Sequence, residues 1–323
     1  MKLTVGTFNL NNLFSRYNFQ AEIDALRDGE SLVAGETLYQ FGPNDAFKVR
    51  SYKGRLVKAK DAAGTAQVAE RIRRIDVDVL AVQEAEDIDT LRQFNREHLG
   101  GMYRHVVLVE GNDPRLIDVG VLSKYPLGAV TSWQRAVHPE TPQELIFGRD
   151  LLEIEVLNER GNARLFTLFN THLKSQFVDF RDDPVAGRAA ADQRRTRQAQ
   201  TMARIIKLRT RPDSRYAVVG DMNDTPDSAP LAGFTQDAEL GLVNALANPS
   251  ETRAAKADVP MPATAAWTHR FKAADAPAHY ALYDQVWLSP PLAPRQSGAW
   301  IDRRTKHGGD GSDHDPAWVE LEL

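Results

Sequence analysis

Nine short segments with β-strand character are distributed along almost the whole chain. Several are enriched in Val, Ile, Phe or Tyr and bounded by Gly, Pro, Asn or Asp, as expected of strands. They cover residues 3–9, 77–82, 103–109, 118–123, 151–157, 164–170, 216–220, 283–289 and 317–323. Helical periodicity is found only between them, at 65–75, 88–99 and 192–208. This alternation predicts a large mixed α/β or α+β sandwich.

Three long stretches without clear periodicity, 14–60, 176–191 and 248–278, are expected to be loops. At 323 residues, the chain has a length that suits one large domain or two small ones. No internal repeat is visible, and chemically important segments lie on both sides of the last loop. We therefore expect one domain, 1–323, with these long loops.

Composition limits the chemistry that this chain can perform. It contains no cysteine, which excludes disulfides, thiolate metal sites and a cysteine nucleophile. A metal would need oxygen or imidazole ligands, which favours Mg²⁺, Mn²⁺ or Ca²⁺. The formal net charge of −4 argues against electrostatic coating of nucleic acid but is compatible with a local basic groove. No apolar run has the length of a membrane helix and no signal peptide precedes the first strand, so we expect a soluble, cytoplasmic protein without membrane insertion.

Carboxylate, amide and imidazole groups are concentrated where the strands begin or end. The segments are Thr-Phe-Asn-Leu (7–10), Gln-Glu (83–84), Asn-Thr-His-Leu (170–173), Gly-Asp-Met-Asn-Asp (220–224) and Gly-Ser-Asp-His-Asp-Pro (311–316). Such groups project from a sheet edge, where sites are commonly built. Asp221 and Asn223 lie on the same side of an extended segment, where they could bind a hard cation or grip a reacting water. Each segment alone is typical of a turn or cap, but the ordered set indicates a site.

In chain order, this set resembles the endonuclease/exonuclease/phosphatase superfamily, which includes deoxyribonuclease-like enzymes, abasic-site endonucleases, inositol-phosphate phosphatases and neutral sphingomyelinases. Tyr-Asp-Gln-Val-Trp-Leu-Ser (283–289) and Ser-Asp-His-Asp-Pro (312–316) complete the match, which covers essentially the whole chain. The resemblance implies a four-layer sandwich of two mixed β-sheets packed face to face with helices outside. It also implies phosphoester hydrolysis with a divalent metal, Mg²⁺ or Mn²⁺, at the sheet edge.

The resemblance further implies a role for each matching residue. The metal ligands would be Glu84, Asn9 and Asp313. Asp221 and Asn223 would orient and activate the attacking water, and Asp221 sometimes also binds the metal. His314 would be the catalytic histidine, with Asp284 as its acid partner, and His172 would donate to a phosphate oxygen. These roles suit an anionic phosphoester, whose hydrolysis requires charge neutralisation and a placed water. His314 could stabilise charge as imidazolium or take a proton from water as imidazole.

The charges around this site lead to further expectations. Converging carboxylates predict an electronegative cleft with raised carboxyl pKa values, and Arg149 and Lys174 would be the only positive charges at its rim. Arg149 resembles a family arginine that could contact phosphate or brace a catalytic carboxylate. Four other histidines are interpreted as ordinary surface residues: His138, His269, His279 and His307.

Three features bear on the substrate. Basic residues share one quadrant of the helix near 192–211, which we interpret as a solvated outer face: Arg197, Arg204, Lys207 and Arg211. The segments at 172–175 and 193–199 resemble a bacterial branch with nuclease-like members. Aromatic residues in the first loop could stack bases or form a small core under the loop: Tyr17, Phe19, Tyr39, Phe41, Phe47 and Tyr52.

These features favour a phosphodiesterase or nuclease acting on nucleic acid. The alternative is a phosphatase or lipid phosphodiesterase that uses the same site on an inositol-phosphate- or sphingomyelin-type substrate. A third hypothesis, a catalytically silent binding module, is disfavoured because Glu84, Asp221 and His314 are all present. The sequence implies a phosphoester substrate and no obligate protein partner.

Overall fold

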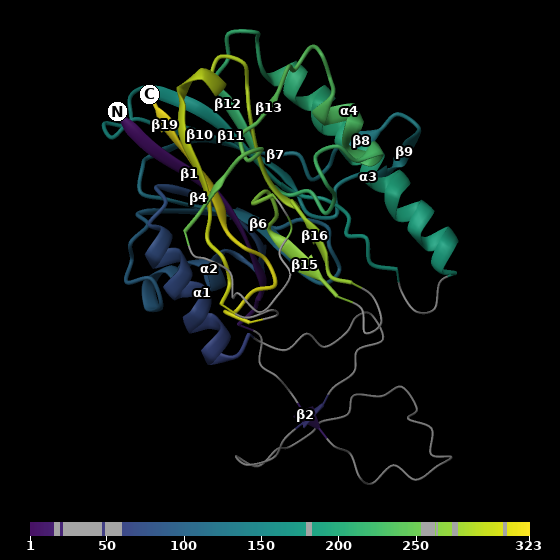
Figure 1. Ribbon diagram of the computed structural model, residues 1–323, viewed down its shortest axis with the longest axis horizontal. Helices are drawn as coiled ribbons and strands as arrows, with labels where there is room; N and C mark the ends of the chain where they lie inside the picture. Colours follow the sequence, from purple (N-terminus) through teal and green to yellow (C-terminus); the bar gives the residue numbers. More distant parts are fainter. Residues whose placement is uncertain are drawn as a thin grey trace.

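Two large β-sheets form the centre of the molecule in the computed structural model (Figure 1). The structure describes residues 1–15, 20–21, 47–48, 60–178, 183–252, 262, 264–272, 277–305 and 309–323. The short strands β2 (Gln20–Ala21) and β3 (Phe47–Lys48) are described by their backbone alone. The aromatic side chains predicted to lie in the first loop therefore fall outside the described residues, as does His307.

The first sheet has seven strands and is mixed. Strands β1 and β4 run parallel, whereas β1 and β19 run antiparallel. Their order is β14 (Ser250–Glu251), β18 (Gln296–Ile301), β19 (Ala317–Glu322), β1 (Lys2–Leu13), β4 (Val79–Ala85), β6 (Asp118–Ser123) and β5 (His105–Val109).

The second sheet has six strands and is also mixed, because β11 and β12 run parallel whereas the other pairs are antiparallel. Their order is β13 (Val243–Asn244), β17 (Asp284–Leu288), β12 (Tyr216–Asp221), β11 (Arg164–His172), β10 (Leu151–Leu157) and β7 (Leu127–Ser132). Two small hairpins stand beside the sheets: β8 (Val137–His138) with β9 (Thr141–Leu145), and β15 (His269–Phe271) with β16 (His279–Ala281).

Three apolar clusters separate four layers. One cluster fills the space between the sheets, and each of the others packs helices on the outer face of one sheet. Figure 1 shows α1 (Ala62–Ile75) and α2 (Ile88–Glu97) on one side and α3 (Pro184–Arg209) and α4 (Ala232–Thr235) on the other. Short 3₁₀ turns occur at Ala229–Leu231 and Ala293–Arg295. The predicted four-layer sandwich is confirmed.

The helix α3 begins earlier than its apolar periodicity indicates. The Asp183 side chain accepts hydrogen bonds from the backbone N–H groups of Val185 (3.1 Å) and Ala186 (2.8 Å), and Pro184 occupies the first turn. A capping aspartate followed by proline is a strong helix start. Residues 184–191 are therefore helical, and the prediction of a loop over 176–191 is wrong for that part. The first turns of α3 are largely exposed and leave no apolar stripe to detect.

The predicted apolar stripe of α3 is buried, at Ala199, Met202 and Ile206. On the outer side of this helix, Arg197 and Lys207 pair with acidic side chains, while Arg204 is exposed. The basic quadrant is thus a solvated outer face over residues 197–207; Arg211 lies beyond the helix end. None of the described helices combines the length and apolar character needed to cross a bilayer.

Candidate active site

Strand register brings the polar residues of the second sheet together at one edge. In the parallel pair β11 and β12, His172 lies opposite Asp221. In the antiparallel pair β12 and β17, Asp221 lies opposite Asp284. In the first sheet, Asn9 lies opposite Gln83, which precedes Glu84. Residues far apart in sequence therefore converge because their strands end at the same edge.

Asp221 lies at the centre of this convergence. Its Oδ2 accepts a hydrogen bond from Asn9 Nδ2 (2.9 Å) and lies 3.4 Å from His172 Nε2 and 3.8 Å from His314 Nε2. Its Oδ1 accepts from the backbone N–H of Asn223 (2.8 Å). Burial, together with the charge of Asp284, raises the pKa of Asp221 to about 6 although His314 opposes the shift. The site therefore holds a carboxylate that titrates close to neutral pH.

His314 and Asp284 form a buried pair. His314 Nδ1 lies 2.7 Å from Asp284 Oδ2, and the backbone N–H of Asp284 donates to Thr268 Oγ1 (3.0 Å). Burial alone would lower the pKa of His314, but the Asp284 and Asp221 carboxylates outweigh it and hold that pKa well above its ordinary value. This direction of the pKa shift favours the imidazolium form of His314 next to Asp221.

Glu84 is held in an unusual backbone conformation. Its φ of 61° is left-handed, which is costly for a non-glycine residue and is often associated with functional sites. Glu84 Oε2 accepts from the backbone N–H of Asn12 (2.9 Å), and Oε1 lies 4.0 Å from His172 Nε2. The carboxylates of Glu84 and Asp221 thus both lie within 4.0 Å of the same atom, His172 Nε2. Two carboxylates gathered in this way fit a hard divalent cation.

The surroundings of His172 favour its neutral form. Burial and the nearby Arg149 lower its pKa well below the ordinary value. Its Nε2 faces both carboxylates, and its buried Nδ1 has no hydrogen-bond partner among the described residues. An uncharged imidazole can donate one hydrogen bond without adding charge.

Asp313 is accompanied by a histidine that the sequence analysis assigned to the surface. His269 Nε2 lies 3.8 Å from Asp313 Oδ2, and its ring stacks on Tyr283 and lies 4.9 Å from the ring of His314. The interpretation of His269 as an ordinary surface residue is wrong, because the β15–β16 hairpin folds it against the site. The same interpretation is wrong for His138, which is buried. The predicted rise of carboxyl pKa values holds for Asp221 but not for Asp313: burial would raise its pKa, but His314 and His269 lower it.

A third cation adds to the two predicted at the rim. Lys60 Nζ donates to Asn11 O (2.7 Å). Burial lowers the pKa of Lys60, although the nearby Asp313 and Glu84 carboxylates raise it. The expectation that only Arg149 and Lys174 bring positive charge is therefore wrong. Lys60 lies at the end of the first long loop, without any motif to mark it.

Arg149 and Asn223 meet at one backbone carbonyl. Arg149 Nη1 and Asn223 Nδ2 both donate to Leu173 O, at 3.1 Å each, and Arg149 Nε pairs with Asp113 (3.0 Å). Arg149 is only 3% exposed. These contacts are with Leu173 and Asp113, so they show neither of the two roles considered for it, a phosphate contact or bracing of a catalytic carboxylate.

Lys174, the other cation predicted at the rim, is held within its own loop and against α3. Its Nζ donates to Ser175 O (3.1 Å) and Phe177 O (3.2 Å), and burial together with Arg149 lowers its pKa to about 8. The adjacent α3 fixes its backbone, because Gln198 Oε1 accepts from Lys174 N (2.9 Å) and Arg195 Nη1 donates to Lys174 O (2.9 Å).

Gln83 and Asn170 clamp the two sheets behind the site. Gln83 Nε2 donates to Asn170 Oδ1 (2.8 Å), and Asn170 Nδ2 donates to Val82 O (3.1 Å) and Gly120 O (2.8 Å). Both side chains are fully buried. Both occur in the sequence segments singled out above, but only the structure gives them this role.

A model of the Endonuclease/Exonuclease/phosphatase family matches residues 6–314. The chain belongs to the endonuclease/exonuclease/phosphatase family. Members of this family are hydrolytic phosphoesterases that generally use divalent metals. A search of curated proteins finds no match.

Solved structures similar to this family member include proteins named for both nuclease and phosphatase activities. An AP endonuclease from Archaeoglobus fulgidus has a TM-score of 0.57 at 15% identity, covering 99% of this chain and 100% of that one. D. rerio TDP2 complexed with single strand DNA product has a TM-score of 0.57 at 15% identity, covering 100% and 99%. A mannosyl-6-phosphatase from Bacteroides thetaiotaomicron has a TM-score of 0.56 at 13% identity, covering 99% and 100%. At these identities the likeness concerns the fold.

Proposed function

We propose that this protein is a divalent-cation-dependent phosphodiesterase that cleaves nucleic acid by in-line attack of water. The observation that supports this most is the position of Asp221, between the His314–Asp284 pair and Glu84 at one sheet edge. A near-neutral base, a buried cationic acid and oxygen ligands for a cation are the groups that phosphoester hydrolysis requires.

Glu84, Asn9 and Asp313, together with Asp221, would hold the cation. Their donor atoms are carboxylate and amide oxygens, which suit Mg²⁺ or Mn²⁺. When bound, this cation would supply charge neutralisation at the phosphate oxygens.

The residues of the chain itself would handle water and protons. Asp221 would accept the proton of the attacking water, because its pKa of about 6 leaves it ionised at neutral pH. Asn223 would orient that water through Oδ1, since its Nδ2 donates to Leu173 O. His314, held as imidazolium by Asp284, would donate to a phosphate oxygen as negative charge develops in the transition state. Neutral His172 would donate a second hydrogen bond there.

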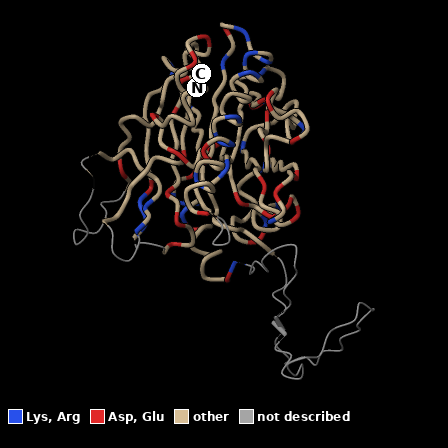
Figure 2. The backbone as a smooth tube through the Cα atoms, turned by 90° about the vertical axis from the view of Figure 1, so that its right-hand side faces the viewer, with Lys and Arg blue, Asp and Glu red and all other residues tan. Residues whose placement is uncertain are grey.

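Nucleic acid is the substrate class that we favour. Two of the similar structures are named as an AP endonuclease and as TDP2 in complex with single strand DNA product. Charges of both signs are interspersed over the described chain (Figure 2). The phosphates of the nucleic-acid backbone would therefore be held by cations close to the site, among them Lys174. The mannosyl-6-phosphatase supports the alternative of a phosphatase acting on a small substrate.

A substrate panel tests the proposal: DNA, RNA, bis-p-nitrophenyl phosphate and p-nitrophenyl phosphate, each with Mg²⁺ or Mn²⁺. We expect cation-dependent cleavage of nucleic acid and the diester, with substrate affinity that falls steeply with salt because several phosphates are bound. Preference for the monoester, with a shallow salt dependence, would favour the phosphatase. No hydrolysis of any of the four would contradict the proposal.

The variant His314→Ala tests the chemistry. It should lower kcat by about 10²- to 10⁴-fold and change KM little, since its interaction strengthens only in the transition state. His105→Ala, a histidine at the start of β5 at the other end of the first sheet, is the matched control and should behave as wild type. A raised KM with unchanged kcat in His314→Ala would make His314 a ground-state contact only.

A further inference from the structure

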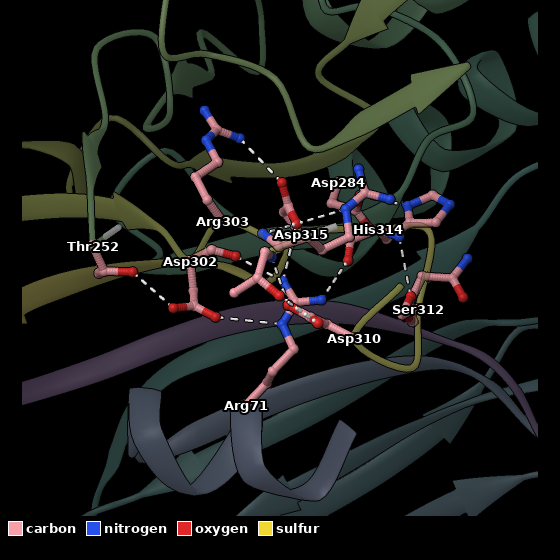
Figure 3. A network of polar contacts seen from close by, with 12 residues as sticks. Arg71, Thr252, Asp284, Asp302, Arg303, Asp310, Ser312, His314 and Asp315 are labelled. Atoms are coloured by element: carbon pink, nitrogen blue, oxygen red, sulfur yellow. Dashed lines mark hydrogen bonds and ion pairs between the residues drawn. The ribbon is translucent and has the colours of Figure 1, made fainter. Parts of the chain in front are cut away.

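A buried ionic network contacts the backbone of His314, whereas Asp284 contacts its ring (Figure 3). Its members come from three separate segments: Arg71, Asp302, Arg303 and Asp315. Each is at most 2% exposed. We call these four residues the Arg71–Asp315 network. The proposed catalytic groups do not include any of them.

Arg71 ties the helix α1 to the segment that carries His314. Its Nη1 donates to His314 O (3.1 Å), and its Nη2 donates to Asp315 Oδ1 (3.0 Å) and Asp302 O (2.7 Å). Its guanidinium lies 5.1 Å from the centre of the Phe8 ring. One planar group thus fixes two chain segments against a helix of the outer layer.

Asp315 extends the connection to the other member of the catalytic pair. Its carboxylate also accepts from the backbone N–H of Arg304 (3.1 Å) and from Arg303 Nη1 (3.3 Å). Its backbone N–H donates to Thr268 O (2.8 Å), and Thr268 Oγ1 accepts from the backbone N–H of Asp284 (3.0 Å). His314 and Asp284 are therefore tied to one scaffold through Asp315 and Thr268.

Stability does not by itself account for charges buried in this way. Desolvation of buried ions can exceed their mutual attraction, and apolar replacements of similar volume are often as stable. Arg71 also stands on the face of α1 where Val68 and Ile72 pack, a position that suits an apolar side chain. What this network provides is a fixed geometry, and catalytic groups have to be held within about 0.5 Å of their working positions.

We propose that Arg71 and Asp315 are positioning residues for the His314–Asp284 pair. By fixing the His314 backbone, they keep His314 Nε2 at its 3.8 Å separation from Asp221 Oδ2 while the ring remains hydrogen-bonded to Asp284. The proposal rests on the proposed function, because it requires His314 to act in hydrolysis. Removing Arg71 or Asp315 should therefore lower turnover more than it lowers substrate binding.

Arg71→Met tests this with little change in volume. Its kcat should fall about 10- to 100-fold, as is common when groups supporting an active site are removed, and KM should stay within about two-fold. Arg71→Lys keeps the charge but has one donor nitrogen in place of three, so it should recover part of the loss. The matched control is Arg74→Met, on the same helix: among the described residues its ion pairs are with Asp302 and Glu70, and none is with Asp315. It should keep kcat within about two-fold of wild type.

A second readout is independent of activity. The proton between His314 Nδ1 and Asp284 should give a far-downfield ¹H NMR resonance, which should persist in Arg74→Met and broaden or move upfield in Arg71→Met. Equal kcat in the two variants, or an unchanged resonance in Arg71→Met, would overturn the positioning role. If Arg71→Met does not fold, Asp315→Asn is expected to show the same losses and decides in its place. If wild type hydrolyses no substrate of the panel, the proposed function fails, and the resonance alone decides the positioning role.

Discussion

The space between the two sheets is apolar at one end of the strands and polar at the other. Alternate residues of a strand face the same side, and on β11 this face runs from Leu168 through Asn170 to His172. On β12 it runs from Val219 to Asp221. Leu168 and Val219 belong to the core between the sheets, whereas the other three residues carry the polar contacts described above.

The strands of the first sheet repeat this change. Along β1, the face passes from Val5 through Thr7 to Asn9, and β4 similarly reaches Gln83. Thr7 Oγ1 donates to Gln83 Oε1 (3.2 Å), and Asn9 bridges to Asp221 in the other sheet. The candidate site is thus the polar continuation of the central core. Burial at the apolar end stabilises the fold. Holding reactive polar groups in place at the other end lowers that stability.

Asp221→Asn should show the largest difference between an effect on activity, which depends on the polar end, and an effect on stability, which depends on the apolar end. The amide cannot accept a proton from water, so kcat should fall by about 10²- to 10⁴-fold. The free energy of unfolding should be unchanged or higher, because a buried charge is removed. Initial rates with bis-p-nitrophenyl phosphate and urea unfolding measure both. Asp213→Asn, an exposed residue before the start of β12, is the control. Loss of activity caused by unfolding would contradict the comparison.

Leu168→Ala should have the opposite profile. Truncating a fully buried leucine in the central cluster leaves a cavity and should lower the free energy of unfolding by about 2–5 kcal/mol. The folded fraction should keep its kcat, since the site lies beyond Asn170 on the same strand. Urea unfolding and rates corrected for the folded fraction test this. A large fall in kcat with unchanged stability would show that the two ends are not separable.

The pH dependence of kcat/KM should depend on groups at the polar end and not on the apolar end. Protonation of Asp221, whose pKa is raised to about 6, removes the base, so kcat/KM should fall about tenfold between pH 7 and pH 5 at low Mg²⁺. A bound cation favours the ionised carboxylate and should move this inflection to lower pH. Rates measured at two Mg²⁺ concentrations check the sign. A profile that is flat between pH 5 and pH 7 at low Mg²⁺ would remove Asp221 as the base.

Much of the fold could be predicted from local pattern, because buried strands carry strong apolar signals. The strands at 118–123 and 151–157 have the predicted bounds. The convergence of Asn9, Glu84 and Asp221 followed from motifs at strand ends, in the order shared with the family.

Other features depend on packing that no local pattern encodes. His269 and Lys60 reach the site from a hairpin and from a loop end. Arg71 interrupts the apolar face of α1, and its partners lie more than 200 residues away in sequence. The start of α3 depends on its cap instead of on periodicity.

The most direct test of a cation-dependent site at the polar end is the Mg²⁺ dependence of bis-p-nitrophenyl phosphate hydrolysis by Glu84→Gln, with Glu70→Gln on the exposed face of α1 as control. Replacing a charged ligand by a neutral one should raise the Mg²⁺ concentration for half-maximal rate and lower turnover by about 10²-fold or more. Glu70→Gln should match wild type. An unchanged Mg²⁺ dependence in Glu84→Gln would place the cation elsewhere and contradict the account.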